Sequence, residues 1–116
     1  MNERREPYLG EGQTPVLSLK SLAKHFGLPQ ISAKAEYLNP TGSYKDRIAA
    51  ATVKDAIRQA NRGWIGTSSG NGGAAMSAYG SRAGLPGFLC IPTNTPPEKL
   101  KSIVPYGTTL FLVPEI

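Results

Sequence analysis

One lysine in the segment from Asn39 to Arg47, Asn-Pro-Thr-Gly-Ser-Tyr-Lys-Asp-Arg, is the side chain best placed to do chemistry. Pro40 and Gly42 predict a turn, which delivers Lys45 to the first turn of a helix. The N-terminal end of a helix carries partial positive charge, which penalises a cation and favours the uncharged, nucleophilic amine. Lys45 is therefore a candidate Schiff-base residue. Without further context, a surface lysine paired with Asp46 is the simpler interpretation.

A second segment, from Thr67 to Gly73, has the composition of an anion site. It offers hydroxyls, the carboxamide of Asn71 and unobstructed backbone N–H groups ahead of a predicted helix, which suits a carboxylate or a phosphate. A glycine-rich turn that allows close packing of helix and strand explains the segment equally well.

The same loop partly matches the dinucleotide pattern G-x-G-x-x-A at Gly70, Gly72 and Ala75. This match is weak because the loop does not follow the first strand and no acidic residue occurs until Glu98. A Walker phosphate loop is excluded, since no Gly-Lys-Ser/Thr follows the glycines. We therefore treat nicotinamide binding as a minor alternative.

Other reactive side chains are few. His25 lies near the C-terminus of a predicted amphipathic helix that runs from Leu17 and ends at Gly27, and it is expected to face solvent. Cys90 lies in an apolar run and is expected to be a buried thiol. One histidine and one cysteine cannot build a zinc site, so no metal is expected.

Length and charge set the remaining limits. The 116 residues fit one domain or a piece of a larger one, and the net charge of +5 comes from scattered basic residues. No basic run alternates with aromatic residues, so a solvated surface is favoured over nucleic-acid binding. The start lacks a signal-peptide pattern and no apolar stretch reaches membrane-spanning length, which predicts a soluble cytoplasmic protein with no membrane partner.

Strand and helix patterns alternate along the chain. Apolar spacing predicts a helix from Ser43, as N-cap, to Ala60, with Gly63 as its stop, and a second helix from Ala74 to Arg82 closed by Gly84. Pro96 and Pro97 predict a third helix through Val104. Strands are predicted over residues 31–38, 64–67, 88–91 and 108–113. The alternation predicts an α/β fold, a small parallel sheet flanked by helices in three layers, with both loops at the carboxyl ends of strands.

These motifs occur in an order that resembles the threonine synthase family of fold-type-II pyridoxal-phosphate enzymes, in its N-terminal part. The resemblance rests on four segments, residues 10–17, 34–47, 68–71 and 101–107, and covers the chain from Gly10 to about Val113. It implies a lead-in segment with a short helix over residues 1–30 and a partial small α/β domain over residues 31–116, without the family's C-terminal large domain.

The resemblance also implies roles. Lys45 forms the Schiff base with pyridoxal 5'-phosphate and shuttles protons, Asn71 hydrogen-bonds the ring hydroxyl, and Tyr44 lies near the cofactor. Ser68, Ser69, Gly70 and Asn71 hold the carboxylate of an amino-acid substrate. The implied reaction is that of a carbon–oxygen lyase, which converts O-phosphohomoserine into threonine and phosphate.

Two departures qualify the implied activity. Gly72 follows the loop asparagine where the family often has a polar residue, which leaves other β-elimination or replacement reactions open, such as that of cysteate synthase. Family members also continue beyond this sequence and supply a phosphate-binding loop there. We therefore expect a portion that is inactive or weakly active alone. The alternative is a non-catalytic interaction module that self-associates or pairs with a separately encoded second half.

Overall fold

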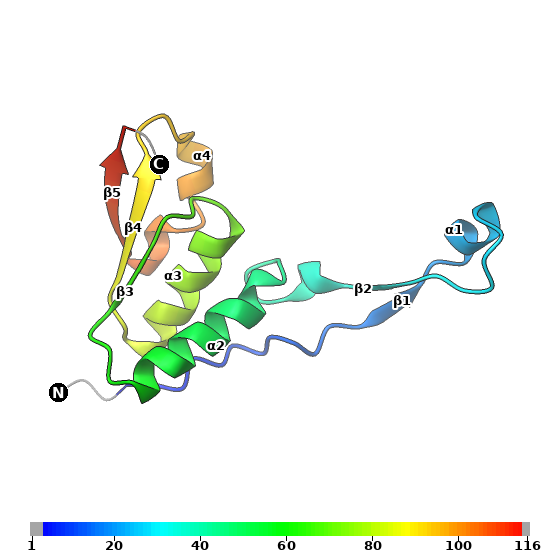
Figure 1. Cartoon of the computed structure of the whole chain (residues 1–116), viewed down its shortest axis with the longest axis horizontal. Helices are drawn as coiled ribbons and strands as arrows, with labels where there is room; N and C mark the ends of the chain where they lie inside the picture. The colour runs from blue at the N-terminus through cyan, green and yellow to red at the C-terminus, as the bar shows by residue number, and fades with distance from the viewer. Residues whose placement is uncertain (1–3, 115–116) are drawn as a thin grey trace.

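The computed structural model describes residues 4–114, in which β1, α1 and β2 (residues 16–34) form a long arm that projects from the body of the molecule (Figure 1). The molecule measures 56 × 35 × 21 Å along its principal axes. In chain order the elements are β1 (Val16–Ser18), α1 (Lys20–His25), β2 (Ser32–Lys34), the 3₁₀ turn η1 (Glu36–Leu38), α2 (Lys45–Arg58), β3 (Trp64–Gly66), α3 (Asn71–Ala83), β4 (Gly87–Pro92), α4 (Pro97–Leu100), the 3₁₀ turn η2 (Val104–Tyr106) and β5 (Thr109–Val113).

The body is built on a parallel sheet with strand order β3-β4-β5. Gly66 pairs with Leu89, which pairs in turn with Leu110. Because each strand is added on the same side of its predecessor, right-handed crossovers place the connecting helices on one face of the sheet. The predicted α/β class, a small parallel sheet packed by helices, is confirmed. Within residues 4–114 the helical layer covers that one face (Figure 1).

The core lies between this face and the helices α2 and α3, which pack against each other. Small side chains line both helices, which lets their backbones approach closely. On α2 these are Ala49 and Ala56, beside Val53, and on α3 the buried alanines include Ala75 and Ala78. Leu85, Leu89, Ile91 and Ile103 complete the core on the sheet side.

The indole of Trp64 fixes the spacing between α3 and the sheet. A Cβ built on Gly80 of α3 would lie 2.4 Å from Trp64 Nε1, and one built on Gly87 of β4 would lie 2.2 Å from Trp64 Cζ2. Neither distance is sterically possible for a real Cβ, so glycine is required on both sides of the ring. The ring therefore sets how closely the helix and strand approach.

The three longer helices end with the same backbone motif. A residue with positive φ follows the last turn, and a backbone bond from the next residue closes it: Leu28 N–H to the Ala23 carbonyl in α1, Asn61 N–H to Ala56 in α2 and Leu85 N–H to Gly80 in α3, each 2.9 Å. Gly27 and Gly84 were predicted to end their helices, and they do. The prediction that Gly63 ends α2 is wrong, because Ala60, with φ 56°, already takes the left-handed conformation.

Two predicted elements in the arm are shorter in the structure than the sequence pattern indicated. Residues 17–27 were expected to be helical, and residues 31–38 to form a strand. Instead β1 and β2 pair antiparallel, with Leu17 opposite Ala33, and α1 and η1 are short. The hairpin is extended at both ends by the bonds Leu19 N–H to Ile31 carbonyl and Ala35 N–H to Pro15 carbonyl. These cross-strand bonds override a local helical pattern over residues 17–19.

The predicted helix over residues 96–104 is also shorter in the structure. α4 ends at Leu100, and the chain continues through turns into η2. Pro105 has no backbone N–H, so it cannot continue an α-helical ladder. No helix within residues 4–114 has the length and apolar character required to cross a membrane.

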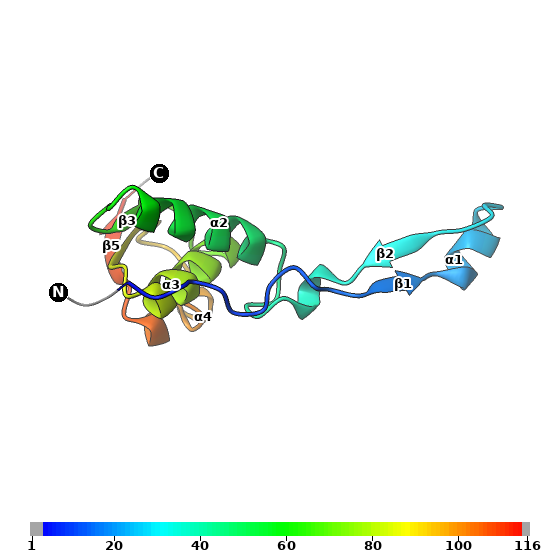
Figure 2. The same ribbon diagram turned by 90° about the horizontal axis from the view of Figure 1, so that it is seen from below.

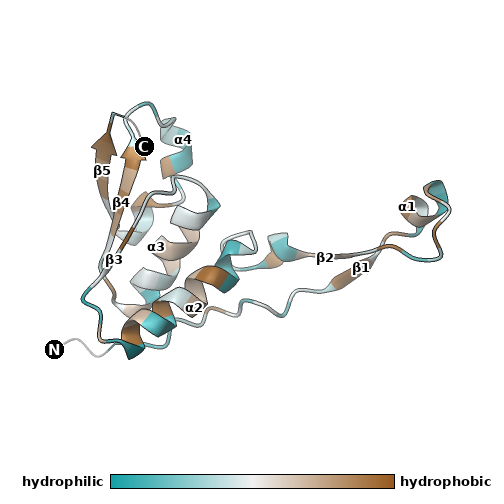
Figure 3. Ribbon diagram, viewed as in Figure 1, coloured by the Kyte–Doolittle hydropathy of each residue, from teal (hydrophilic) through white to brown (hydrophobic). Residues whose placement is uncertain are grey.

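The second face of the parallel sheet is apolar and open to solvent. Ile65 is 74% exposed, Phe111 48% and Phe88 37%, and the rings of Phe88 and Phe111 stack with centroids 6.0 Å apart. Figure 3 shows the hydrophobic colouring of β4 and β5. Cys90 lies on this face and is partly exposed, so the predicted burial of its thiol is wrong. We call Ile65, Phe88, Cys90 and Phe111 the outer face.

Candidate functional site

Lys45 is the first residue of α2, as the turn before it predicted. The backbone N–H of Lys45 donates to Ser43 Oγ at 3.2 Å, but the N-cap residue is Tyr44 and no side chain caps the helix, so the prediction of Ser43 as N-cap is wrong. The Lys45 amine lies 4.9 Å from the centroid of the Tyr44 ring, and both side chains are accessible to solvent. The amine is thus presented at a helix start beside an aromatic ring.

Asp46 does not pair with Lys45. Its carboxylate is fully buried and accepts hydrogen bonds from the Thr41 backbone N–H at 2.7 Å, from the Thr41 hydroxyl and from the Tyr79 hydroxyl at 3.1 Å. The simpler interpretation of Lys45 as a surface lysine paired with Asp46 is therefore wrong. Asp46 instead closes the turn that precedes Lys45 and ties α2 to α3.

Tyr79 lies between two carboxylates. Its hydroxyl is 3.0 Å from Glu11 Oε2 and 3.1 Å from Asp46 Oδ2. Burial raises the pKa of Tyr79 well above its ordinary value, and the neighbouring Glu11 and Asp46 carboxylates raise it further. The phenol therefore stays protonated and acts as a hydrogen-bond donor at neutral pH.

Arg47 forms a forked ion pair with Glu36. Its Nε and Nη2 donate to the two carboxylate oxygens at 2.8 Å each, and Nη2 also donates to the Gly12 carbonyl at 2.9 Å. These bonds to Arg47, with one from the Thr14 hydroxyl at 2.8 Å, lower the pKa of Glu36 to about 2. Glu36 is therefore a carboxylate throughout the neutral range.

Asn39 joins the same network. Its carboxamide nitrogen donates to the Glu36 carboxylate and backbone carbonyl at 2.9 Å, and its oxygen accepts from the Gly12 N–H at 3.0 Å. Residues 11–14, which run beside α2, are thus fixed to the turn that carries Lys45. We call this set of residues the lysine-loop network: Glu11, Gly12, Thr14, Glu36, Asn39, Thr41, Asp46, Arg47 and Tyr79.

The loop from Ser68 to Gly70 connects β3 to α3, and Asn71 is the first residue of that helix. A Cβ on Gly73 would lie 1.8 Å from the Ser68 carbonyl oxygen, so the loop folds onto the helix start and tolerates only glycine there. The first N–H groups of a helix have no intrahelical acceptor and remain available to a ligand. The loop therefore precedes a helix start, as predicted, and its binding of an anion stays a prediction.

The two segments lie at the starts of two helices that pack against each other. Lys45 and Asn71 each begin a helix, and α2 and α3 lie side by side in both views (Figures 1 and 2). Tyr44, Ser68 and Asn71 are exposed, and Ser69 is half-buried. No group of three residues suited to hold a metal ion is found within residues 4–114.

Sequence reasoning missed three members of the lysine-loop network. Tyr79 reaches Glu11 across 68 positions, and Glu36 reaches Arg47 across 11. Such long-range contacts leave no periodic signal, so neither Glu11, Glu36 nor Tyr79 was a candidate. Lys45 and the loop residues Ser68, Ser69 and Asn71 were predicted as candidates because residue type and sequence order alone indicate them.

The α/β body thus carries a lysine at the start of α2 and a glycine-containing loop before the start of α3. The sequence model of the family described as pyridoxal-phosphate dependent enzyme matches residues 8–115. The chain therefore belongs to this family, and the predicted cofactor, pyridoxal phosphate, is confirmed as the cofactor of the family.

Relatives within the family have different names. The chain is 43% identical over 100 residues to a threonine synthase of Halalkalibacterium halodurans, which aligns 85% of this chain with 28% of that protein. It is 35% identical over 109 residues to the cystathionine beta-synthase of Saccharomyces cerevisiae, covering 89% of this chain and 22% of the relative. The crystal structure of an O-ureido-L-serine synthase superposes with a TM-score of 0.76 at 31% identity, over 89% of this chain and 33% of that one. The predicted resemblance and fold are confirmed, and the chain spans about a third or less of the length of these proteins.

Proposed function

We propose that this chain is the lysine-bearing part of a threonine-synthase-like, pyridoxal-phosphate-dependent lyase that converts O-phosphohomoserine and water into threonine and phosphate. The observation that carries the proposal is the lysine-loop network. In this network the side chains of Asp46 and Arg47 fix the turn. The amine of Lys45, the residue directly before them, remains available for chemistry beside the Tyr44 ring.

The residues present fit one end of the cofactor. Lys45 would hold its aldehyde carbon, Tyr44 would lie beside it, and the Asn71 carboxamide would bind the ring hydroxyl. Ser68, Ser69 and Gly70, with the free N–H groups at the start of α3, would hold the substrate carboxylate. The glycine required at position 73 supports this assignment, because it lets the loop of Ser68 to Gly70 pack directly against the start of α3.

When bound, the cofactor supplies an electron sink for a carbanion at the substrate Cα. Lys45 would then take and return the protons at the substrate carbons, because its amine is freed once the substrate replaces it. The partial charge at the two helix starts would favour the anionic groups of the substrate. Since the chain spans a small part of its relatives, we propose that it binds the cofactor weakly and turns over little on its own.

A trapping experiment tests the assignment of Lys45. The chain is incubated with pyridoxal phosphate and reduced with borohydride, and the modified lysine is located by peptide mass spectrometry. We expect an adduct at Lys45 that Lys45→Ala abolishes. Lys54→Ala removes an exposed lysine from the same helix and should leave the adduct unchanged. An equal adduct in the Lys45→Ala variant would refute the assignment.

The second candidate function, an interaction module, is supported by the outer face. Ile65, Phe88 and Phe111 form a contiguous apolar surface across three strands, and such surfaces mark sites of association. We propose that the chain associates through this face, either with itself or with a separately encoded second half.

Sedimentation equilibrium tests self-association. We expect a concentration-dependent rise in mass that Phe111→Ser reduces, while Val104→Ser, an exposed apolar residue outside the sheet, does not. A monomer at all concentrations would rule out the self-associating form and leave only pairing with a different chain.

A further inference from the structure

A groove on the side of α3 is lined by two arginines that have no acidic partner. Arg5, from the segment that precedes β1, and Arg82, in the last turn of α3, both line this groove, which encloses about 380 Å³. Both residues are exposed, and neither forms an ion pair within residues 4–114. Of the described residues, none that lines the groove is acidic. We call it the arginine groove.

The fold holds the two arginines close to each other. The backbone N–H of Arg5 donates to the Ala83 carbonyl at 3.3 Å. The preceding residue, Arg4, donates from its guanidinium to the Gly84 carbonyl. Arg5 is therefore fixed beside the last turn of α3, where Arg82 lies. Two like charges that share a groove repel each other, and an anion bound between them offsets this repulsion.

The acidic residue next to Arg5 in the sequence already has a basic partner elsewhere. The ion pairs within residues 4–114 are Glu36 with Arg47, Glu6 with Lys54 and Asp55 with Arg58. Glu6 follows Arg5 directly, yet it pairs with Lys54 of α2 and lines a different pocket. Its carboxylate is thus engaged outside the arginine groove, and the positive charges of the groove remain for a ligand.

The end of α3 does not oppose the binding of an anion. The carboxyl end of a helix carries partial negative charge on its last carbonyls, which have no intrahelical partner. In α3 these carbonyls accept backbone bonds, at Gly80 from Leu85, at Ser81 from Gly84 and at Ala83 from Arg5. The bonded N–H groups offset the partial charge, so the two guanidinium groups dominate the electrostatics of the groove.

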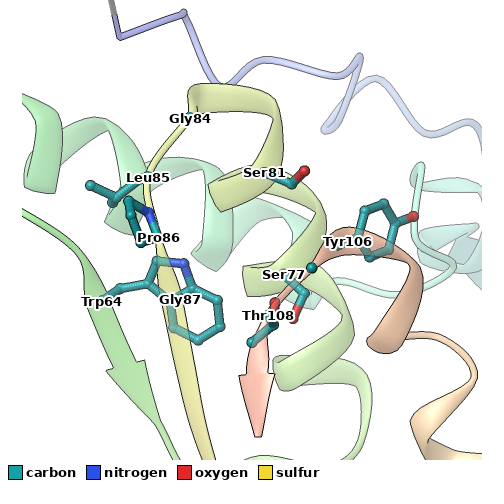
Figure 4. A pocket seen from close by; sticks show the side chains of 10 residues that line it. Trp64, Ser77, Ser81, Gly84, Leu85, Pro86, Gly87, Tyr106 and Thr108 are labelled. Carbon is teal, nitrogen blue, oxygen red and sulfur yellow. The ribbon is translucent and has the colours of Figure 1, made fainter. Parts of the chain in front are cut away.

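The other lining residues define the class of anion. Ser81 and Tyr106 add hydroxyl donors, and Figure 4, which shows a neighbouring pocket, places both side chains on the opposite side of α3 from the Trp64 ring. Two guanidinium forks and two hydroxyls offer more donors than the two oxygens of a carboxylate accept, and they suit the three terminal oxygens of a phosphate monoester. An apolar wall for an organic substituent is added by Leu9, Pro40 and Ala78.

The arginine groove is separate from the groups assigned to pyridoxal phosphate and its substrate. Ser81 and Asn71 are separated by about 15 Å along the axis of α3, at 1.5 Å per residue. The groove reaches Thr41, in the turn before Lys45, but neither Lys45 nor the loop before α3 lines it. A ligand in this groove therefore adds to the proposed function and does not rest on it.

We propose that the arginine groove binds a phosphate monoester with a small apolar substituent. Arg5 and Arg82 donate charge-assisted hydrogen bonds to the phosphate, and the hydroxyls of Ser81 and Tyr106 donate to its remaining oxygens. The substituent contacts Leu9. Because both arginines are exposed, added salt weakens the binding.

Phenyl phosphate is a suitable probe, because it has no aldehyde that reacts with lysine. The full chain, isotopically labelled, is titrated at about pH 7.5, where a phosphate monoester is mostly dianionic, and the ionic strength is held constant. We expect saturable shifts, at about millimolar concentrations, in the amide resonances of Ser81, Arg82 and Tyr106. Benzoate, with one charge and two oxygens, and phenol, with no charge, should bind at least about fivefold more weakly.

Matched variants test the contacts. Arg5→Gln and Arg82→Gln should each weaken phenyl phosphate binding by at least about fivefold, because each removes charge-assisted hydrogen bonds. Arg62→Gln removes the same charge from an exposed residue outside the groove and should leave the affinity within about twofold. Ser81→Ala and Tyr106→Phe each remove one hydroxyl and should weaken binding by about two- to tenfold.

Several outcomes would overturn the proposal. The absence of saturation up to about tens of millimolar phenyl phosphate would mean that the groove is no binding site. Equal weakening by Arg62→Gln and Arg82→Gln would indicate an adventitious ion only, attracted by the net charge of +5. Shifts confined to residues 68–72 would place the phosphate at the loop before α3. Lys45→Ala should bind phenyl phosphate as the unmodified chain does, so failure of the proposed function would leave this inference intact.

Discussion

Lys45, Asp46 and Arg47 are consecutive, yet their side chains make different kinds of contact. Asp46 is buried and accepts bonds from Thr41 and Tyr79, and Arg47 forms a forked ion pair with Glu36. Lys45 makes neither kind of contact, and its amine lies beside the ring of Tyr44. The two charged residues that follow the lysine therefore build the turn, and the lysine is the residue that the turn presents.

Asp46→Asn tests the first of these contacts. The substitution keeps the size of the side chain but replaces one acceptor with an N–H₂ group, which must face donors on Thr41 or Tyr79. We expect the free energy of unfolding, measured in urea, to fall by about 1–3 kcal/mol. Asp55→Asn is the control on the same helix, and its exposed side chain should change the free energy by less than about 0.5 kcal/mol. Equal effects would mean that Asp46 is not the anchor of the turn.

The Glu36–Arg47 pair predicts a loss of stability in acid. The pKa of Glu36 is lowered to about 2 in the folded chain, from 4.5. A lowered pKa stabilises the fold above the unfolded value, and this contribution is lost as the pH falls from about 4.5 toward 2. We expect the urea midpoint to drop over this window, and Glu36→Gln to show a shallower drop. A Glu36→Gln profile parallel to that of the unmodified chain would contradict the assignment.

At the scale of elements, the shared helix ending makes a prediction about Ala60. Gly27 and Gly84 occupy the left-handed position in α1 and α3, whereas Ala60 occupies it in α2, with φ 56°. We expect Ala60→Gly to raise the free energy of unfolding by about 1 kcal/mol, because a side chain is disfavoured in this conformation. Gly84→Ala is the reciprocal change and should lower the free energy of unfolding by a similar amount. A Cβ at position 84 would contact no neighbouring atom, so the strained backbone conformation is its only cost. Thermal or urea unfolding measures both, and effects of the same sign would refute the argument.

The elements of the body were predictable because their signals are local. Trp64–Gly66, Gly87–Pro92 and Thr109–Val113 are apolar runs bounded by turns, and α2 and α3 have helical spacing followed by a stop. The arm was mispredicted because the pairing of Leu17 with Ala33 depends on a partner 16 positions away. Propensity within three-residue strands is too weak to reveal such a pairing.

The candidate site was predictable to a different extent. Lys45, Ser68, Ser69 and Asn71 were identified from residue types and their place before helices, and their roles are still proposals. The groups that hold the turn, such as Glu36 and Tyr79, were invisible because their bonds join distant positions. The packing of Trp64 against Gly80 and Gly87 could not be predicted either, because a glycine in the sequence does not indicate which side chain it contacts.

At the scale of the whole molecule, the arm and the body differ in how much they bury. Val16, Phe26 and Leu28 of the arm are 65%, 61% and 51% exposed, and a two-stranded hairpin alone is marginally stable. We expect amides of residues 16–34 to exchange with deuterium at least about tenfold faster than those of residues 74–83 in mass spectrometry. Similar protection in both segments would contradict this, and protection that grows with concentration would show that a second copy covers the arm.

The ring of Trp64 between Gly80 and Gly87 has a mechanical consequence. α3 is a stiff rod of 13 residues, held at its carboxyl end by this contact, while Asn71 stands at its other end. Gly80 and Asn71 are separated by about 14 Å along the helix axis, at 1.5 Å per residue. A methyl group added at Gly80 would push the carboxyl end of α3 away from the sheet and would tilt its amino end, where Asn71 lies. The absence of a side chain at Gly80 thus determines the tilt of α3 and, with it, the position of the Asn71 side-chain amide relative to the sheet.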